Sequence, residues 1–186
     1  DIAVLAGGEA WRTRMRARKE GVELAWPTAP EGSVPRSVGE DLVMNHPDEI
    51  DRKIVMPVQV YPMFETAIRA AAGRSPEDHL VRISELWSRF SEVAAANPHA
   101  WIRNAMTAEE IRTPGPTNRM VGLPYTKVMI SNNDVDMGAA LIMCSVEKAR
   151  SLGIAPERWV FVHSGTDCHE HQFISHRWSF AETPAV

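Results

Sequence analysis

The chain has 186 residues, of which 44% are hydrophobic and 24% are charged, and its formal net charge is -4. This composition fits one globular domain or a piece of a larger one, and the charge gives no reason to expect nucleic acid or a membrane as a partner. Because no apolar run is long enough to span a bilayer and the two cysteines make no disulfide framework, we expect a cytoplasmic protein.

The first expected element is a strand at residues 2–8, because "IAVLAGG" is a continuous apolar run that ends in two glycines. Continuous apolarity is typical of a buried strand in a parallel-type sheet. The basic stretch at 9–21 fits either a helical turn or a solvated loop. The sequence opens inside this strand without an initiator methionine, so we expect a piece of a longer protein.

Residues 26–62 carry six prolines, which predicts a long irregular excursion. One helix is expected at 62–73. A second is expected at 75–97, with a serine cap, a proline at its first helical position and an Asn-Pro stop. Apolar residues recur at helical spacing along the second helix, so its aromatic residues Trp87 and Phe90 are interpreted as core.

The rest of the chain alternates turn signals with short apolar runs. Thr107 and Glu110 have capping-box spacing, and 113–127 is extended and rich in turns. The run "GAALIMCS" at 138–145 fits a strand or a helix on pattern alone. A short helix at 145–153 and a buried strand at 159–163 follow, which predicts that 138–145 and 159–163 share one sheet through a crossover.

The stretch "HSGTDCHEH" holds side chains of the metal-ligand and nucleophile types. A second ligand pair at zinc-site spacing does not follow, which favours a polar loop over a metal site. Cys168 beside His169 is a weak candidate for a thiolate–imidazole pair, because catalytic pairs usually meet through the fold. Cys144 lies in an apolar run and is interpreted as an inert core thiol. "AGGEAW" departs too far from GxGxxG to indicate a dinucleotide site.

Asn132, Asn133 and Asp134 precede the run at 138–145. Their amide and carboxylate groups could orient a ligand, or they could hold a turn, because Asn and Asp accept tight backbone geometry readily. Without further information, the residues favour the turn.

Three stretches in order resemble one family. They are "DIAVLAGGEAW", then "VYPMFETAIRAAAGRSPEDHLVRISELWSRFSEVAAANPHAW", then "NNDVDMGAALIMCSVEKARSLGI". They are similar to the strand before a glycine turn, the helical loop domain and the entry into the C-terminal half of the thiolase superfamily. Within it, the resemblance points to the sterol-carrier-protein-type (SCP2-type) thiolases and related acetyl-CoA acetyltransferases.

The resemblance implies an α/β fold: a partial, layered thiolase-like fold with a mainly helical loop-domain insertion. Residues 1–20 would end the N-terminal core half, 21–127 would form the loop domain, and 128–186 would begin the C-terminal core half. In that arrangement 138–145 is a strand, and its small residues at 138–140 allow close backbone approach.

The resemblance also implies a function, namely part of an acyl-CoA acyltransferase of lipid or sterol side-chain metabolism. A coenzyme A (CoA) thioester would be the substrate, no cofactor would be tightly bound, and the protein would form homo-oligomers. Asn133 matches a serine that contacts the pantetheine arm, with Asn132 beside it, whereas Met137 replaces the family's Asp. Neither cysteine matches a catalytic position, so we expect no catalytic and no metal-binding residue here. The alternative is a catalytically silent acyl-CoA-binding or lipid-binding protein.

Overall fold

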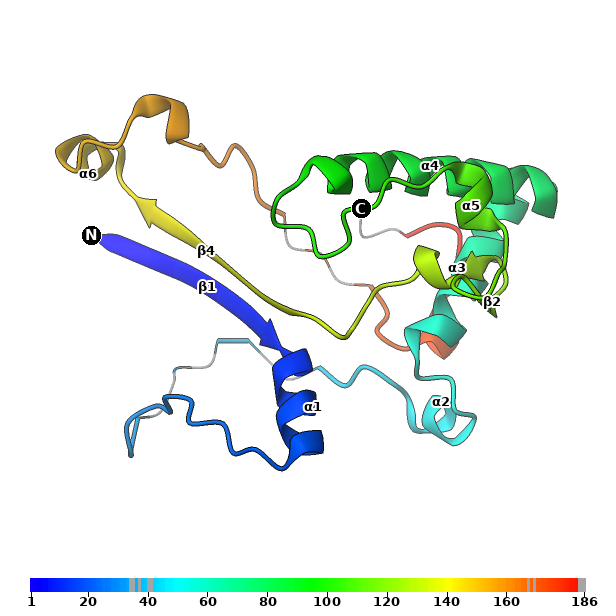
Figure 1. Ribbon diagram of the computed structural model, residues 1–186, viewed down its shortest axis with the longest axis horizontal. Coiled ribbons are helices and arrows are strands. Elements are labelled where there is room, and N and C mark those ends of the chain that lie inside the picture. The colour runs from blue at the N-terminus through cyan, green and yellow to red at the C-terminus, as the bar shows by residue number, and fades with distance from the viewer. Residues whose placement is uncertain (34–35, 37, 40–41, 167, 169, 184–186) are drawn as a thin grey trace. The chain divides into compact units, whose positions relative to one another are not determined.

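A computed structural model describes residues 1–33, 36, 38–39, 42–166, 168 and 170–183 (Figure 1). The chain divides into two compact units. Unit 1 comprises residues 1–35 and 132–167, and unit 2 comprises residues 36–131 and 168–186. Within the described residues, no helix combines the length and the apolarity that crossing a membrane requires.

Unit 1 is built on a two-stranded antiparallel ribbon of β1 (Ile2–Ala10) and β4 (Asp136–Cys144) (Figure 1). The register pairs Ile2 with Cys144 and Ala10 with Asp136. Both strands were expected, and the structure settles the choice between strand and helix at 138–145 in favour of a strand.

The expectation that the first of these strands is buried in a parallel-type sheet is wrong. The pairing is antiparallel, and the side chains on the ribbon are largely open, with Val4 65% and Leu141 71% exposed. Among the described residues the sheet consists of these two strands alone, and a two-stranded ribbon is too small to bury its own faces.

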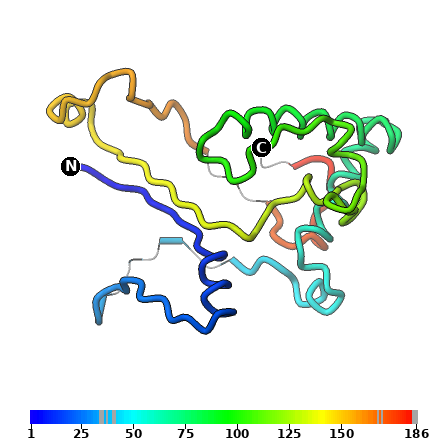
Figure 2. The backbone as a smooth tube through the Cα atoms, in the orientation of Figure 1, coloured from blue at the N-terminus to red at the C-terminus, as the bar shows by residue number. Residues whose placement is uncertain are grey.

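The expected strand at 159–163 is also wrong, because these residues follow an irregular path (Figure 2). Val160 is 92% exposed, and no strand edge pairs with this described segment. Trp159 instead turns back toward the preceding helix: its Nε1 donates a hydrogen bond to the carbonyl of Ile154 at 3.0 Å, and the Arg150 guanidinium lies 5.8 Å from its ring. An apolar run becomes a strand only where a partner can satisfy its backbone groups.

Two helices flank the ribbon in sequence. The basic stretch at 9–21, which fitted a helical turn or a loop, contains the helix α1 (Trp11–Glu20). This helix ends at Gly21, which has a positive φ of 65°. The helix α6 (Val146–Ser151) begins where expected, because the Ser145 hydroxyl accepts the N–H of Lys148 at 3.1 Å. A 3-10 turn, η2 (Pro156–Arg158), follows.

The region that was expected to be irregular contains the helix α2 (Pro47–Asp51) and the first residues of α3 (Pro57–Ala71). The expected start of α3 at residue 62 is wrong. Pro57 takes the first helical position, and Gln59 Oε1 accepts the N–H of the cap residue Met56 at 3.0 Å, so the helix begins five residues earlier.

Pro62 therefore lies inside α3, where it cannot donate to the carbonyl of Val58. The strand β2 (Met120–Gly122) packs close to this carbonyl. A Cβ added to Gly122 would meet the Val58 oxygen at 3.2 Å, so the approach depends on the absence of a side chain at 122.

The helices α4 (Pro76–Ala96) and α5 (Ala108–Arg112) begin at the expected caps. The Ser75 hydroxyl accepts the N–H of Asp78 at 3.0 Å. Thr107 and Glu110 form a reciprocal capping box, with the Thr107 hydroxyl accepting at 3.2 Å and the Glu110 carboxylate at 2.8 Å.

The core of unit 2 lies where α4 and α5 meet the hairpin of β2 and β3 (Tyr125–Thr126) and the following 3-10 turn η1 (Lys127–Met129). Its buried centre is Ile83, Ile111 and Met129, against which Leu80, Trp87, Met106 and Tyr125 pack. The core assignment of Trp87 is confirmed. That of Phe90 is wrong, because Phe90 is 52% exposed and meets Trp87 edge-on. The five-residue α5 is too short to cover the whole apolar face of α4.

Buried Glu49 ties the final described segment to α2. Its carboxylate accepts the backbone N–H of Ser175, in the turn η3 (Ile174–His176), at 2.7 Å and that of His46 at 3.0 Å. The Ser175 N–H makes the larger contribution in lowering the pKa of Glu49 to about 2.

Candidate functional site

Asn132 and Asn133, the expected ligand contacts, lie in an exposed loop immediately before β4. The Asn132 side-chain oxygen accepts the N–H of Asp134 at 3.1 Å, which forms a local turn. The turn leaves the Asn132 amide nitrogen and the exposed Asn133 side chain available, so the contact with a ligand stays a prediction.

The end of this loop is fixed to the start of α1. The Asp136 carboxylate accepts the backbone N–H of Thr13 at 3.0 Å and its hydroxyl at 2.7 Å, and the N–H of Arg12 donates to the carbonyl of Val135 at 3.3 Å. Asp136 thus caps a helix that has no side-chain cap at Ala10. The bonds from Thr13, the backbone one first, lower the pKa of Asp136.

The cysteines and the histidine-rich stretch were the other candidates. Cys144 ends β4 half-buried and Cys168 is exposed, and both are free thiols. Asp167 and His169 lie outside the described residues, so the pairing of Cys168 with His169 stays untested. Across the part of the chain that the structure describes, no three His, Cys, Asp or Glu side chains are grouped to hold a metal ion.

Glu170, from the same stretch, has a structural partner set. Its carboxylate accepts the Thr183 hydroxyl and lies 3.6 Å from the Arg177 guanidinium. The Thr183 bond makes the largest contribution in lowering the pKa of Glu170. The Arg177 guanidinium in turn lies 5.2 Å from the ring of Phe64 on α3, so Glu170 helps to fasten the final segment to that helix.

A buried polar cluster that the sequence did not indicate joins α3, α4 and β3. His79 Nε2 lies 2.5 Å from Glu65 Oε1, and the Tyr125 hydroxyl donates to Glu65 Oε2 at 2.5 Å. When Glu65 is ionised its carboxylate only accepts, so Tyr125 and the Nε2–H form of His79 are both donors to it. We refer to these three residues as the Glu65 cluster.

The Glu65 cluster is shielded from water. His79 is 3% exposed, and the side chain of Glu65 is 20% exposed. Burial, followed by the hydrogen bond and the negative charge of Glu65, holds the pKa of Tyr125 well above its ordinary value of 10.0. Among the described residues His79 Nδ1 has no hydrogen-bond partner, so the cluster has an unused polar atom.

A cavity of about 440 Å³ opens beside the Glu65 cluster. It lies between the C-terminal half of α3, the first turn of α4 and the β2–β3 turn, and both Glu65 and His79 line it. Its other lining residues are Thr66, Arg69, Pro76, Glu77, Leu80, Leu123 and Pro124.

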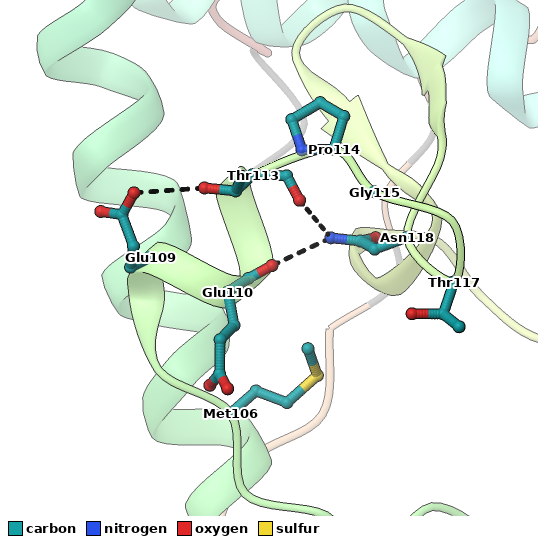
Figure 3. A pocket seen from close by; sticks show the side chains of 8 residues that line it. All are labelled: Met106, Glu109, Glu110, Thr113, Pro114, Gly115, Thr117 and Asn118. Carbon is teal, nitrogen blue, oxygen red and sulfur yellow. Dashed lines mark hydrogen bonds between the residues drawn. The ribbon is translucent and has the colours of Figure 1, made fainter.

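A second cavity, of about 430 Å³, lies beside α5 (Figure 3). The amide of Asn118 and the carboxylate of Glu109, which line it, are already paired. The Asn118 amide donates to the carbonyls of Glu110, Ile111 and Thr113 at 3.0 to 3.3 Å, and the Glu109 carboxylate accepts from Arg112 and Thr113. These bonds cap the C-terminal end of α5. The cavity beside the Glu65 cluster is therefore the better candidate for a ligand site.

Comparison with known proteins gives one informative result. No family model matches the chain, and no curated protein matches it by sequence. Six chains of solved structures match. One is a monomeric SCP2-thiolase-like protein type 1 from Mycobacterium smegmatis, with a TM-score of 0.71 and 29% sequence identity over 100% of this chain. This chain spans 33% of the length of that structure.

The resemblance found in the sequence is confirmed, and so is the fold class. The chain has a partial α/β fold of the SCP2-thiolase-like type, with small sheets and a mainly helical second unit. The domain bounds 1–20, 21–127 and 128–186 stay predictions.

Proposed function

We propose that the protein to which this SCP2-thiolase-like chain belongs acts on CoA thioesters, as an acyl-CoA acyltransferase of lipid metabolism. The observation that supports this proposal is the shared fold over the whole chain. In the proposed reaction the thiolate of CoA attacks the carbonyl carbon of an enzyme-bound thioester. The new sulfur–carbon bond forms the acyl-CoA, and the enzyme thiolate leaves.

The contribution proposed for this chain is binding. Asn132 and Asn133 stand in an exposed loop whose far end is held by the contacts between Asp136 and Thr13. A loop fixed in this way can present side-chain amides to the amide groups of a pantetheine arm at a low entropic cost. Cys144 and Cys168 match no catalytic position of the family, so the acyl-carrying thiol is not assigned to either.

A catalytically silent CoA-thioester-binding protein is the second candidate. It is favoured by the start of β4: Met137 stands where the family has an acidic residue, and Met137 is 58% exposed. The adjacent carboxylate of Asp136 is engaged by Thr13 and cannot replace the missing one without uncapping α1.

The binding proposal is tested by titrating acetoacetyl-CoA into the chain and into two variants. Asn133→Ala should weaken binding about tenfold, the effect of losing a hydrogen bond worth about 1.4 kcal/mol. Asn104→Ala, which removes an exposed amide in unit 2, should leave binding unchanged. Equal affinities of the two variants, or absence of binding to the chain, would remove the assigned role of Asn133.

The two candidate functions are separated by acylation. An acyl group transferred from acetyl-CoA to a cysteine of the whole protein, detected by mass spectrometry, supports the acyltransferase. Saturable binding without an adduct or turnover supports the silent protein. Self-association and a cytoplasmic location remain proposals, to be tested by sedimentation and by cell fractionation.

A further inference from the structure

The cavity beside the Glu65 cluster has the parts of a ligand site. Its volume of about 440 Å³ lies within the range of about 300–1,000 Å³ that is typical of small-molecule sites. Pro76, Leu80, Leu123 and Pro124 supply apolar wall. Leu123 is 75% exposed, so an apolar ligand body would cover a side chain that now faces water.

Glu65 offers a positioned acceptor in this cavity. Each carboxylate oxygen already accepts one short bond, from His79 or from Tyr125, and each keeps a further lone pair. These two bonds fix the carboxylate, and its 20% exposed side chain lines the cavity. His79 also lines the cavity, and its buried Nδ1 has no hydrogen-bond partner among the described residues.

The charge of the residues that line the cavity indicates which kind of ligand group it would bind. Two carboxylates, Glu65 and Glu77, and one guanidinium, Arg69, line the cavity, so its net charge is -1 with His79 neutral and zero with His79 protonated. Arg69 is partly occupied, since its Nη1 donates to the carbonyl of Arg74 at 2.8 Å. The net charge of the lining is therefore negative or zero, which favours a cation or a neutral donor over an anion.

We propose that this cavity binds a primary ammonium group carried on an apolar body. The ammonium group donates to Glu65, and the apolar body lies against Leu80, Leu123 and Pro124. Such a ligand differs in charge from a CoA thioester, so the inference does not rest on the proposed function and describes a second binding site.

The test compares three six-carbon probes, hexylammonium, hexan-1-ol and hexanoate, titrated into the full chain at neutral pH. Hexylammonium should bind at least about tenfold more tightly than hexan-1-ol, because a hydrogen bond to a charged group is worth more than a neutral one. Hexanoate should bind most weakly. Equal affinities, tighter binding of hexanoate, or absence of hexylammonium binding would each overturn the proposal.

Two variants locate the site. Glu65→Gln keeps the shape and removes the charge, so it should weaken hexylammonium about tenfold and leave hexan-1-ol nearly unchanged. Leu123→Ser should weaken both probes, because it removes apolar wall from an exposed turn. If Glu65→Gln does not fold, nuclear magnetic resonance shifts of the wild-type chain decide: shifts at Leu80 and Leu123 on adding hexylammonium support the site, and shifts confined to other residues overturn it.

Discussion

Replacing Tyr125 by Phe tests whether the Glu65 cluster stabilises unit 2. The variant keeps the ring that packs against the core of Ile83, Ile111 and Met129, and removes the hydroxyl that donates to Glu65 at 2.5 Å. A hydrogen bond to a charged group contributes about 1.5–3 kcal/mol. In the variant Glu65 keeps its contact with His79, so the carboxylate still has one buried partner. We therefore expect the free energy of unfolding to fall by about 2 kcal/mol, within that range.

The chain offers a matched control, because it has two tyrosines. Tyr61 on α3 is 59% exposed, so Tyr61→Phe should change the free energy of unfolding by less than about 0.5 kcal/mol. Urea denaturation, followed by circular dichroism of both variants, gives the comparison. A Tyr125→Phe variant as stable as Tyr61→Phe would show that the bond from Tyr125 to Glu65 does not stabilise unit 2.

The pH dependence of the free energy of unfolding provides a second test of the bond between Tyr125 and Glu65. The folded state raises the pKa of Tyr125, so its contribution is complete below the ordinary value of 10.0 and is lost as the pH rises through the folded value. In Tyr61→Phe, Tyr125 is the remaining tyrosine, and its tyrosinate absorbance should rise only well above pH 10.0 while the chain is folded. Ionisation at the ordinary pH would show that Tyr125 is not buried against Glu65.

Three further changes test other parts of the structure by urea denaturation. Glu49→Gln should cost about 2 kcal/mol at neutral pH, because a buried carboxylate that accepts two backbone N–H groups loses its charge. The folded state lowers the pKa of Glu49, so the difference from wild type should be complete above pH 4.5 and vanish as the pH falls toward about 2; a pH-independent difference would contradict this. Gly122→Ala should cost about 1 kcal/mol through overpacking, whereas Gly115→Ala, whose Cβ would meet no atom within 4 Å, serves as the control, and equal effects would refute the close approach. Asp136→Ala should lower the urea midpoint more than Asp134→Ala, because Asp136 caps α1; the reverse order would show that the cap is unimportant.

Local signals in the sequence were sufficient for several elements. The caps at Ser75, Thr107 and Ser145 begin helices in the structure, because a side-chain oxygen followed at once by helix-forming residues satisfies the first N–H groups locally. The run at 138–145 needed the family resemblance, because its apolar pattern fits a strand and a helix equally.

The predictions from sequence fail where residues distant in the sequence determine the local structure. Pro62 looked like a helix start, but the helix begins after the cap at Met56 and continues through Pro62. The segment 159–163 has the composition of a strand, yet a strand needs an edge to pair with, and composition cannot supply one.

The Glu65 cluster could not be predicted, because 60 residues separate Glu65 from Tyr125. One faint signal existed: His79 precedes Ile83 by four residues and Trp87 by eight, which places an ionisable side chain on the apolar face of α4. A polar group on such a face needs a buried partner, but the sequence does not say which of the acidic residues provides it.

We propose a CoA-thioester-binding role for this chain on the ground of its SCP2-thiolase-like fold. The most direct test of this role is calorimetric titration of acetoacetyl-CoA into the chain, with thiolysis followed in the same sample after adding CoA. We expect saturable binding and no thiolysis by this chain. Absence of binding, or turnover by the chain itself, would contradict it.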